Sequence, residues 1–345
     1  MLQLHHLPAH AISQTASGSP SHLFGVACFG AGSGLDIPRS DIPQACVQVE
    51  PLAGEPALCE VWSAQGPLQR GQHGRLQWCG NAEVVFGVVQ VKEAALSARS
   101  ERVPALQDAA RAAYAEVFNA LDALGYPHLL RVWNHVPDIN GVSAGMERYR
   151  LFNIGRQDAF LAHGRTVAGA DVPAASALGA AADAPLLVYC IAARRPATAI
   201  ENPRQLSAYD YPQDYGPRSP TFSRASLAHF GLQRVLFISG TASIVGHRTL
   251  HAGDVAEQTR ETVRNIDAIL QQAKANGAAG MTLADLHYKV YVRHAADWPV
   301  IRAELQGAAG AGVRVIALQA DVCRMDLLVE IEATGLLTTN QDPFA

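Results

Sequence analysis

The sequence predicts an α+β protein formed by tandem duplication of one unit in which a mixed sheet is covered by helices. The chain has 345 residues, more than one usual domain, and 49% of them are hydrophobic, which is enough for a large core. The order strand, helix, strand, helix, strand occurs once in each half. The last strands of the two halves also align, residues 185–192 with residues 326–333. A shared order and a matching final strand indicate a duplication.

Composition excludes several classes of function. Lys and Arg total 27 against 31 Asp and Glu, a net charge of −4, so a broad basic surface for nucleic acid is not expected. None of the six cysteines forms a CxxC pair, so we expect free thiols and a cytoplasmic protein. No signal peptide is predicted, because the N-terminal residues have no basic region followed by an apolar run. No membrane span is predicted either, because the most apolar stretch, residues 174–193, is interrupted by Asp183 and Pro185.

The second half carries the clearer pattern. Residues 234–244 form an apolar strand that ends in a small-residue turn, and Asp254 with Glu257 marks the start of a helix. Residues 286–293 alternate as a strand, and Asp297 with Pro299 starts a second helix. Strands at residues 313–318 and 326–332 complete this half.

The first half repeats this order with more divergence. Strands are expected at residues 84–91, 129–135 and 186–192, and helices at residues 104–124 and about 146–163. We expect a degenerate N-terminal domain over residues 1–196 and a catalytic C-terminal domain over residues 226–345. Residues 197–225 are rich in Tyr, Pro and Arg, and are expected to cross between the domains and line a cleft; a rigid structural crossover is the alternative.

Two familiar kinds of ligand site are not predicted. The glycine-rich run at residues 29–34 is followed by Pro38 rather than by a helix start, which argues against a dinucleotide site. The thirteen histidines are scattered without ligand spacing, so no metal is expected.

The final strand contains the most informative side chains. Alternation places Glu330 and Glu332 on one face of a strand otherwise made of Leu, Val and Ile. Buried carboxyl groups at this spacing are expected to raise each other's pKa, and a carboxyl with a raised pKa is suited to general-acid catalysis. An edge strand with Glu330 in solvent is the alternative. In the alignment of the two halves, Tyr189 corresponds to Glu330 and His135 corresponds to Arg293. At these positions only the second half has the acid and the guanidinium.

Three segments of the second half carry a resemblance to a known fold. VLFISGTAS at 235–243, YVRHAADW at 291–298 and LLVEIEA at 327–333 resemble the RidA/YjgF (chorismate mutase-like) fold. The duplicated length, MERYRLFNIGRQDAF at 146–160 and YGPRSPTFSRA at 215–225 narrow the resemblance to the chorismatases. The resemblance is greatest to the branch that makes both 3- and 4-hydroxybenzoate.

The resemblance implies cleavage of the enolpyruvyl ether of chorismate to pyruvate and a hydroxybenzoate, with no cofactor. Glu330 matches the family's catalytic acid, which protonates the vinyl group, and Cys323 stands seven residues before it, as in the aromatising branches. An inert core thiol is the alternative for Cys323. The two carboxylates of chorismate call for Arg and Tyr side chains. The candidates are Tyr149, Arg156, Tyr215, Arg218 and Arg293, with Gly240 as a small residue in the pocket; structural ion pairs are the alternative for Arg156 and Arg218.

Other functions are compatible with the same residues. Attack of water on the activated side chain would give the non-aromatic dihydroxy-cyclohexadienoate instead. A RidA-like imine or enamine hydrolase needs an Arg in the penultimate strand, where Arg314 stands out of step. A non-catalytic small-molecule sensor is the third reading. The sequence favours neither a monomer nor a homo-oligomer, and ubiquinone precursor and pigment starter both remain open as the use of the product.

Overall fold

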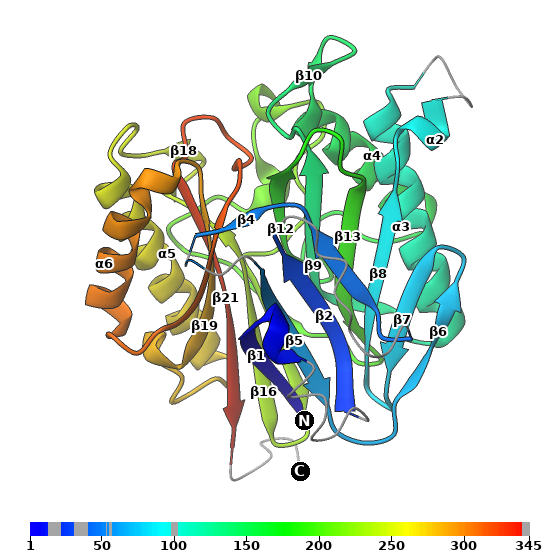
Figure 1. Cartoon of the computed structure of the whole chain (residues 1–345), viewed down its shortest axis with the longest axis horizontal. Helices are drawn as coiled ribbons and strands as arrows, with labels where there is room; N and C mark the ends of the chain where they lie inside the picture. The colour runs from blue at the N-terminus through cyan, green and yellow to red at the C-terminus, as the bar shows by residue number, and fades with distance from the viewer. Residues whose placement is uncertain (13–21, 31–40, 53, 55–56, 98–102, 340–345) are drawn as a thin grey trace.

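The computed structural model describes residues 1–12, 22–30, 41–52, 54, 57–97 and 103–339 (Figure 1). Most of the glycine-rich run at residues 29–34 lies outside these ranges. In the part of the chain that is described, no helix combines the length and the apolar character needed to cross a membrane.

The first repeat unit is a six-stranded mixed sheet with two long helices. From edge to edge its strands are β12 (Ala174–Ala180), β9 (His128–Pro137), β13 (Leu186–Ala193), β8 (Val84–Val91), β7 (Leu76–Gly80) and β6 (Gln69–His73). Its helices are α3 (Ala105–Leu124) and α4 (Arg148–Ala162), with the short α2 (Ala94–Ser97) before them. Strands β9 and β12 are parallel, and the others pair antiparallel.

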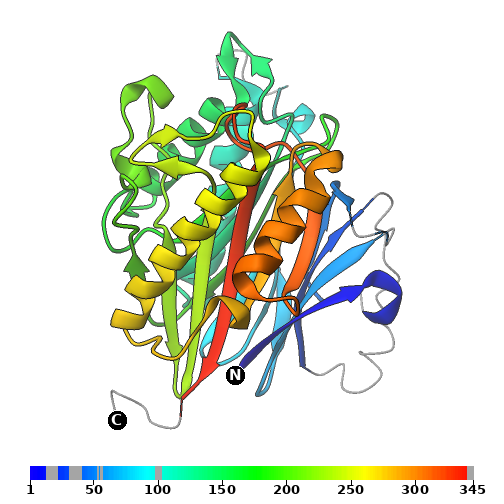
Figure 2. The same cartoon turned by 90° about the vertical axis from the view of Figure 1, so that its left-hand side faces the viewer.

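The second repeat unit follows the same plan. Its sheet contains, in order, β14 (Thr198–Ile200), β15 (Ala225–Phe230), β16 (Gln233–Thr241), β21 (Val329–Thr338), β19 (Leu286–Val292), β20 (Arg314–Gln319) and β4 (Glu50–Pro51). Helices α5 (Val255–Ala275) and α6 (Trp298–Ala309) cover its outer face, which Figure 2 shows from the front.

The topologies of the two units confirm the duplication. In each, a hairpin leads to a helix, then to a parallel strand–helix–strand crossover, and the last strand enters the centre of the sheet. Strand register agrees with the sequence alignment, because Tyr189 lies opposite Trp133 in the first unit and Glu330 lies opposite Tyr291 in the second.

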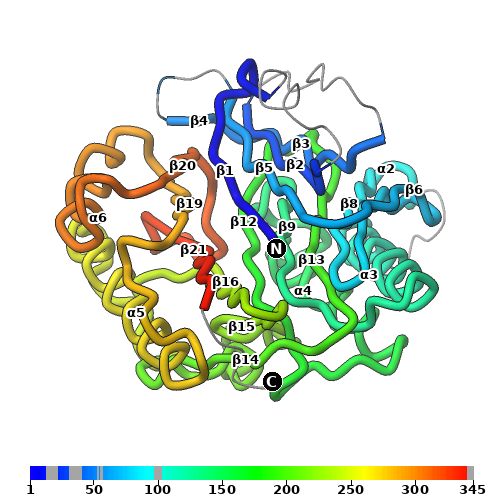
Figure 3. Tube along the Cα trace, turned by 90° about the horizontal axis from the view of Figure 1, so that it is seen from below, coloured from blue at the N-terminus to red at the C-terminus, as the bar shows by residue number. Residues whose placement is uncertain are grey.

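Four strands between residues 2 and 64 form a third sheet that the sequence did not predict. It contains β1 (Leu2–Pro8), β5 (Leu58–Ala64), β2 (Leu23–Phe29) and β3 (Gln44–Val47). Seen from below, the three sheets surround a common centre and the long helices lie outside (Figure 3). Apolar side chains from all three sheets, including Trp62, Trp133 and Phe237, form one core between them.

Helix boundaries follow the expected local signals. The N-cap of α5 is Asp254, whose carboxylate accepts a hydrogen bond from the Glu257 amide. Helix α6 has Asp297 as its N-cap and a proline in its first turn, and α3 ends at Gly125, which adopts a left-handed φ of 76°.

Two boundaries differ from expectation. Residues Met146–Glu147 form β11, which pairs with β10 (Val142–Ser143), so α4 starts two residues later than predicted. Strand β21 starts at Val329 rather than at residue 326, and continues to Thr338. The segment before β21 turns away from the sheet because the Arg293 guanidinium binds carbonyls of Val322, Arg324 and Leu327.

Candidate active site

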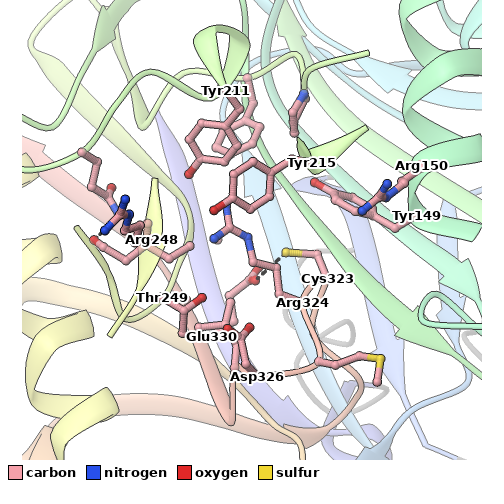
Figure 4. A pocket seen from close by; sticks show the side chains of 18 of the residues that line it. Tyr149, Arg150, Tyr211, Tyr215, Arg248, Thr249, Cys323, Arg324, Asp326 and Glu330 are labelled. Atoms are coloured by element: carbon pink, nitrogen blue, oxygen red, sulfur yellow. Dashed lines mark hydrogen bonds between the residues drawn. The ribbon is translucent and has the colours of Figure 1, made fainter. Parts of the chain in front are cut away.

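A cavity of about 500 Å³ lies where the two repeat units meet (Figure 4). Helix α4 of the first unit, the segment before β15, the hairpin of β17 (Ile244–Val245) and β18 (Arg248–Thr249), and the loop before β21 all contribute. The lining residues are Glu147, Tyr149, Arg150, Gln205, Tyr211, Tyr215, Pro220, Phe222, Arg224, Gly240, Ala242, Ile244, Arg248, Thr249, Cys323, Arg324, Met325, Asp326, Leu327 and Glu330.

Glu330 is the buried acid of this cavity. It lies on β21 between β16 and β19, so it is on a central strand rather than an edge, and is only 5% exposed. Burial raises its pKa to about 8, with a further increase from Glu332 and a smaller opposing effect of Arg131. At neutral pH Glu330 therefore carries a proton that it can donate.

The neighbouring Glu332 has the opposite ionisation behaviour. Its burial alone would raise its pKa, but the Lys289 ammonium and the Arg131 guanidinium outweigh that effect and lower it to about 2. The expectation that the two carboxyl groups raise each other's pKa is therefore wrong for Glu332. The strands that carry these two cations were predicted, but the contacts that bring Lys289 and Arg131 to Glu332 cannot be predicted from alternation within one strand.

Cys323 lies beside the acid. Its Sγ is 4.0 Å from Oε2 of Glu330, and burial, with a contribution from Glu330, raises the pKa of the thiol to about 12. Cys323 is therefore a neutral thiol at physiological pH and presents a weakly polar surface to the reacting groups.

Because Gly240 has no side chain, β16 can approach Glu330 closely. A Cβ at this position would lie 1.9 Å from Oε1 of Glu330, so any side chain would displace the carboxyl group. Its amide donates to Oγ of Ser176 at 2.9 Å, which ties β16 to β12 of the first unit.

Aromatic rings and a guanidinium form one wall of the cavity. The Arg324 guanidinium carbon lies 4.2 Å from the centre of the Tyr215 ring and 5.2 Å from that of Tyr211. Both the Tyr215 hydroxyl and Nη1 of Arg324 donate to the carbonyl of His247, at 2.7 Å and 2.9 Å. Figure 4 shows the Arg324 side chain below the two tyrosine rings and above Glu330.

Further cations line the cavity without having been singled out from the sequence. Arg150 follows Tyr149 in α4, and its Nε donates to Glu147 at 3.1 Å, whereas Arg248 comes from the β17–β18 hairpin. Arg150 lies inside the segment quoted for the resemblance, so that segment offered a signal. Arg248 lies on the short strand β18 and Arg324 on the loop before β21, and the position of both segments depends on tertiary contacts.

Three of the predicted binding residues do not line the cavity. Arg156 is 2% exposed and stacks over Tyr114 and Phe160 inside the first unit. Arg218 is largely exposed and lies 3.8 Å from Asp158. Arg293 binds the carbonyls of the loop before β21 and also Asp321, at 2.6 Å. The structure brings together the other predicted residues: Tyr149, Tyr215, Gly240, Cys323 and Glu330.

The described residues contain no cluster of three or more His, Cys, Asp or Glu side chains of the kind that holds a metal ion. All six cysteines are free thiols. Among the described residues that line this cavity, the Glu330 carboxyl can donate a proton and the Arg and Tyr side chains can bind an anion.

The chain is similar to known proteins over most of its length. Residues 60–192 match the family described as "Chorismatase FkbO/Hyg5-like, N-terminal". A chorismatase of Streptomyces rapamycinicus is 39% identical over 284 residues, which cover 80% of this chain and 81% of the relative. A 3-hydroxybenzoate synthase of Streptomyces hygroscopicus is 36% identical over 305 residues, 86% of this chain and 84% of the relative. The crystal structure of a chorismatase aligns with a TM-score of 0.83 and 33% identity over 97% of this chain and 98% of its own.

Proposed function

The chain belongs to the chorismatase family, and we propose that it cleaves chorismate to pyruvate and a hydroxybenzoate, with Glu330 as the proton donor. The observation that carries the proposal is a buried carboxyl group with a pKa raised to about 8, at the base of a cavity lined by arginines and tyrosines. The names of the relatives support the substrate, and the geometry supports the role of the acid.

The cavity suits a small dianion. Chorismate has one carboxylate on its ring and one on its enolpyruvyl group, and each calls for a charged or hydroxyl donor. Arg150, Arg248 and Arg324, with Tyr149, line the cavity and supply such donors. Tyr215 also lines the cavity, and its hydroxyl would donate to the substrate in exchange for its hydrogen bond to the His247 carbonyl. We assign carboxylate binding to these residues, and to Arg293 a positioning role in the loop that carries Cys323 and Arg324.

The proposed reaction begins with transfer of the Glu330 proton to the vinyl CH₂, which becomes a methyl group and leaves an oxocarbenium ion. The Glu330 carboxylate formed in this step stabilises the cation beside it. The neighbouring ring hydroxyl then displaces the ether oxygen, pyruvate leaves, and the hydroxyl proton returns to Glu330. The arene oxide that results opens and aromatises, so the two products together contain all the atoms of chorismate.

Cys323 and Gly240 support the aromatising outcome. The neutral Cys323 thiol lies 4.0 Å from the Glu330 carboxyl, and Gly240, which has no side chain, lets β16 approach the same carboxyl closely. We propose that this arrangement favours displacement by the ring hydroxyl over attack by water. Opening of the arene oxide in one direction gives 3-hydroxybenzoate and in the other 4-hydroxybenzoate, and we propose both products.

Purified protein incubated with chorismate alone and analysed by chromatography tests the proposal. We expect pyruvate with 3-hydroxybenzoate, 4-hydroxybenzoate or both. Pyruvate with the dihydroxy-cyclohexadienoate would instead assign hydrolysis and remove the proposed role of Cys323. Pyruvate formation no faster than the spontaneous reaction would reject chorismate cleavage.

The alternative of an imine or enamine hydrolase is less well supported. It requires an arginine that reaches the substrate from the penultimate strand. Arg314, on β20, is exposed, donates to the Asp285 carbonyl at 2.6 Å and does not line the cavity. Release of ammonia from a small imine in the absence of chorismate turnover would favour this alternative.

A further inference from the structure

Behind Glu330 lies a buried cluster of charges from all three sheets. Lys289 on β19 lies 2.5 Å from Glu60 on β5 and 2.8 Å from Glu332, and Arg131 on β9 lies 2.6 Å from Glu332. All four side chains are less than 6% exposed. Two cations face two carboxylates, so the cluster is balanced and has no positive charge left over for a third carboxylate.

Glu332 is ionised because its oxygens are fully used. Besides Lys289 and Arg131, it accepts hydrogen bonds from Nε1 of Trp133 at 2.7 Å and from Oγ of Ser176 at 2.6 Å. A carboxylate with four donors in a buried site is strongly stabilised in its charged form. It stands two residues from Glu330 on the same face of β21.

Besides binding Glu332, Ser176 contacts the backbone next to the Glu330 carboxyl. Its Oγ donates to Glu332 and accepts from Arg131 and from the amide of Gly240, the residue whose Cα lies against the Glu330 carboxyl. The Gly240 amide is therefore engaged by Ser176. A backbone N–H that donated to Glu330 instead would stabilise its carboxylate form.

Besides the cavity cations Arg150, Arg248 and Arg324, to which we assign substrate binding, the groups around Glu330 are neutral or already paired. Tyr291 faces it from β19 and Tyr149 from α4, and burial keeps the pKa of both phenols above the ordinary value. Cys323 remains a thiol, and Arg131 donates to Glu332. Arg324 and Arg293 approach Cys323 from the loop side, where Arg293 binds Asp321.

We propose that Glu332 and Ser176 are positioning residues that keep Glu330 protonated and ready to donate. Glu332 places a fixed negative charge beside Glu330, and Ser176 holds the Gly240 amide away from it. The inference rests on the proposed function of Glu330 as the acid. Arg131 and Ser176 belong to the first repeat unit, so that unit sets the protonation of the acid in the second.

Two double variants that each remove one anion and one cation test this role. Glu332→Gln with Lys289→Met removes the charge beside Glu330. Glu60→Gln with Lys289→Met is the matched control, in which Arg131, Trp133 and Ser176 still hold the Glu332 carboxylate. We expect the alkaline limb of kcat/KM for chorismate to move to lower pH by about one unit in the first, a tenfold loss of activity above the limb. The control keeps the limb of the wild type, and KM changes little in either.

Ser176→Ala preserves all four charges, and so tests the proposal even where the double variants do not fold. We expect its alkaline limb to move in the same direction, by a smaller amount. If the alkaline limb of kcat/KM lies at the same pH in Ser176→Ala and in the wild type, the proposed role of Ser176 is wrong. If this limb lies at the same pH in the two double variants, the proposed role of Glu332 is wrong.

A second readout does not depend on turnover. The carboxylic C=O stretch of Glu330, obtained as the infrared difference between wild type and Glu330→Gln, reports its protonation in the free protein. We expect this band to persist to higher pH in the wild type than in Glu332→Gln with Lys289→Met. If the wild type does not turn over chorismate but the band titrates as expected in the two proteins, the proposed function is rejected and the inference is not. If turnover is normal but the band titrates at the same pH in both proteins, the inference is rejected and the proposed function is not.

Discussion

Glu330 and Glu332 have the same side chain, the same strand and the same degree of burial, yet opposite ionisation. The difference lies in their partners: four donors for Glu332, and for Glu330 a thiol at 4.0 Å. One carboxyl is thereby kept neutral and the other charged, which is the separation that acid catalysis near neutral pH requires.

Replacing Glu330 with Gln preserves its shape but removes the transferable proton. We expect turnover of chorismate to fall by a factor on the order of 10²–10⁴, whereas binding of chorismate measured by calorimetry is retained. A variant that keeps full turnover would show that another group donates the proton. A protein that binds chorismate, with no turnover even in the wild type, would be a sensor.

Replacing Gly240 with Ala tests the close approach of β16. The new Cβ would lie 1.9 Å from Oε1 of Glu330 and 3.1 Å from Oγ of Ser176, so the acid must move and kcat should fall strongly. Gly307→Ala is the control, because its Cβ would meet no atom within 4 Å, and we expect unchanged activity. Equal activity of the two variants would contradict the proposed geometry.

At the scale of elements, the loop between β20 and β21 carries much of the site. Cys323 and Arg324 lie on it, and the Arg293 guanidinium binds three of its carbonyls as well as Asn140 and Asp321. Of these partners only Asn140, in the first unit, lies outside the loop. One side chain directly after β19 therefore holds the loop and ties it to the first unit.

We expect Arg293→Met to lower kcat/KM on the order of 10²-fold, because small displacements of reacting groups are costly and the loop carbonyls lose their donors. Thermal unfolding should also shift to lower temperature. Arg314→Met, which removes an exposed arginine on the same sheet, is the control and should leave kcat/KM unchanged. Wild-type kinetics in Arg293→Met would show that the loop holds its position without this side chain.

At the scale of the whole molecule, the buried acid lowers stability at alkaline pH. The folded-state pKa of Glu330 is raised from 4.5 to about 8, so the folded protein binds a proton that the unfolded chain has lost between these values. Stability from this group is complete below the unfolded pKa and decreases as pH rises through the folded one.

Glu330→Gln removes this dependence. We expect the difference in free energy of unfolding between the variant and the wild type to grow in favour of the variant by about 1 kcal/mol per pH unit. This growth occurs between the pKa of Glu330 in the unfolded chain and its pKa in the folded protein. The two proteins should converge in acid. Chemical denaturation at several pH values measures the difference, and a gap that does not change with pH would contradict the protonation state proposed for Glu330.

The sequence by itself determined the repeated order of elements, the helix caps and the presence of Glu330 in an apolar strand. These depend on periodicity and on neighbours within a few positions, such as Asp254 with Glu257. The same local reading did not find the third sheet. Its strands β2 and β5 are buried along almost their whole length and so lack the alternation of a half-buried strand. The domain limits at residues 196 and 226 stay predictions.

Only the tertiary structure decided which arginines face the cavity and which carboxyl is neutral. Arg156 lies in a quoted segment but turns into the core, whereas Arg324 reaches the cavity from a loop. The partners of Glu332 on β9 and β19, and of Lys289 on β5, come from strands distant in the sequence. Burial and charge pairing set a pKa, and both arise from contacts that exist only when the three sheets enclose their common core.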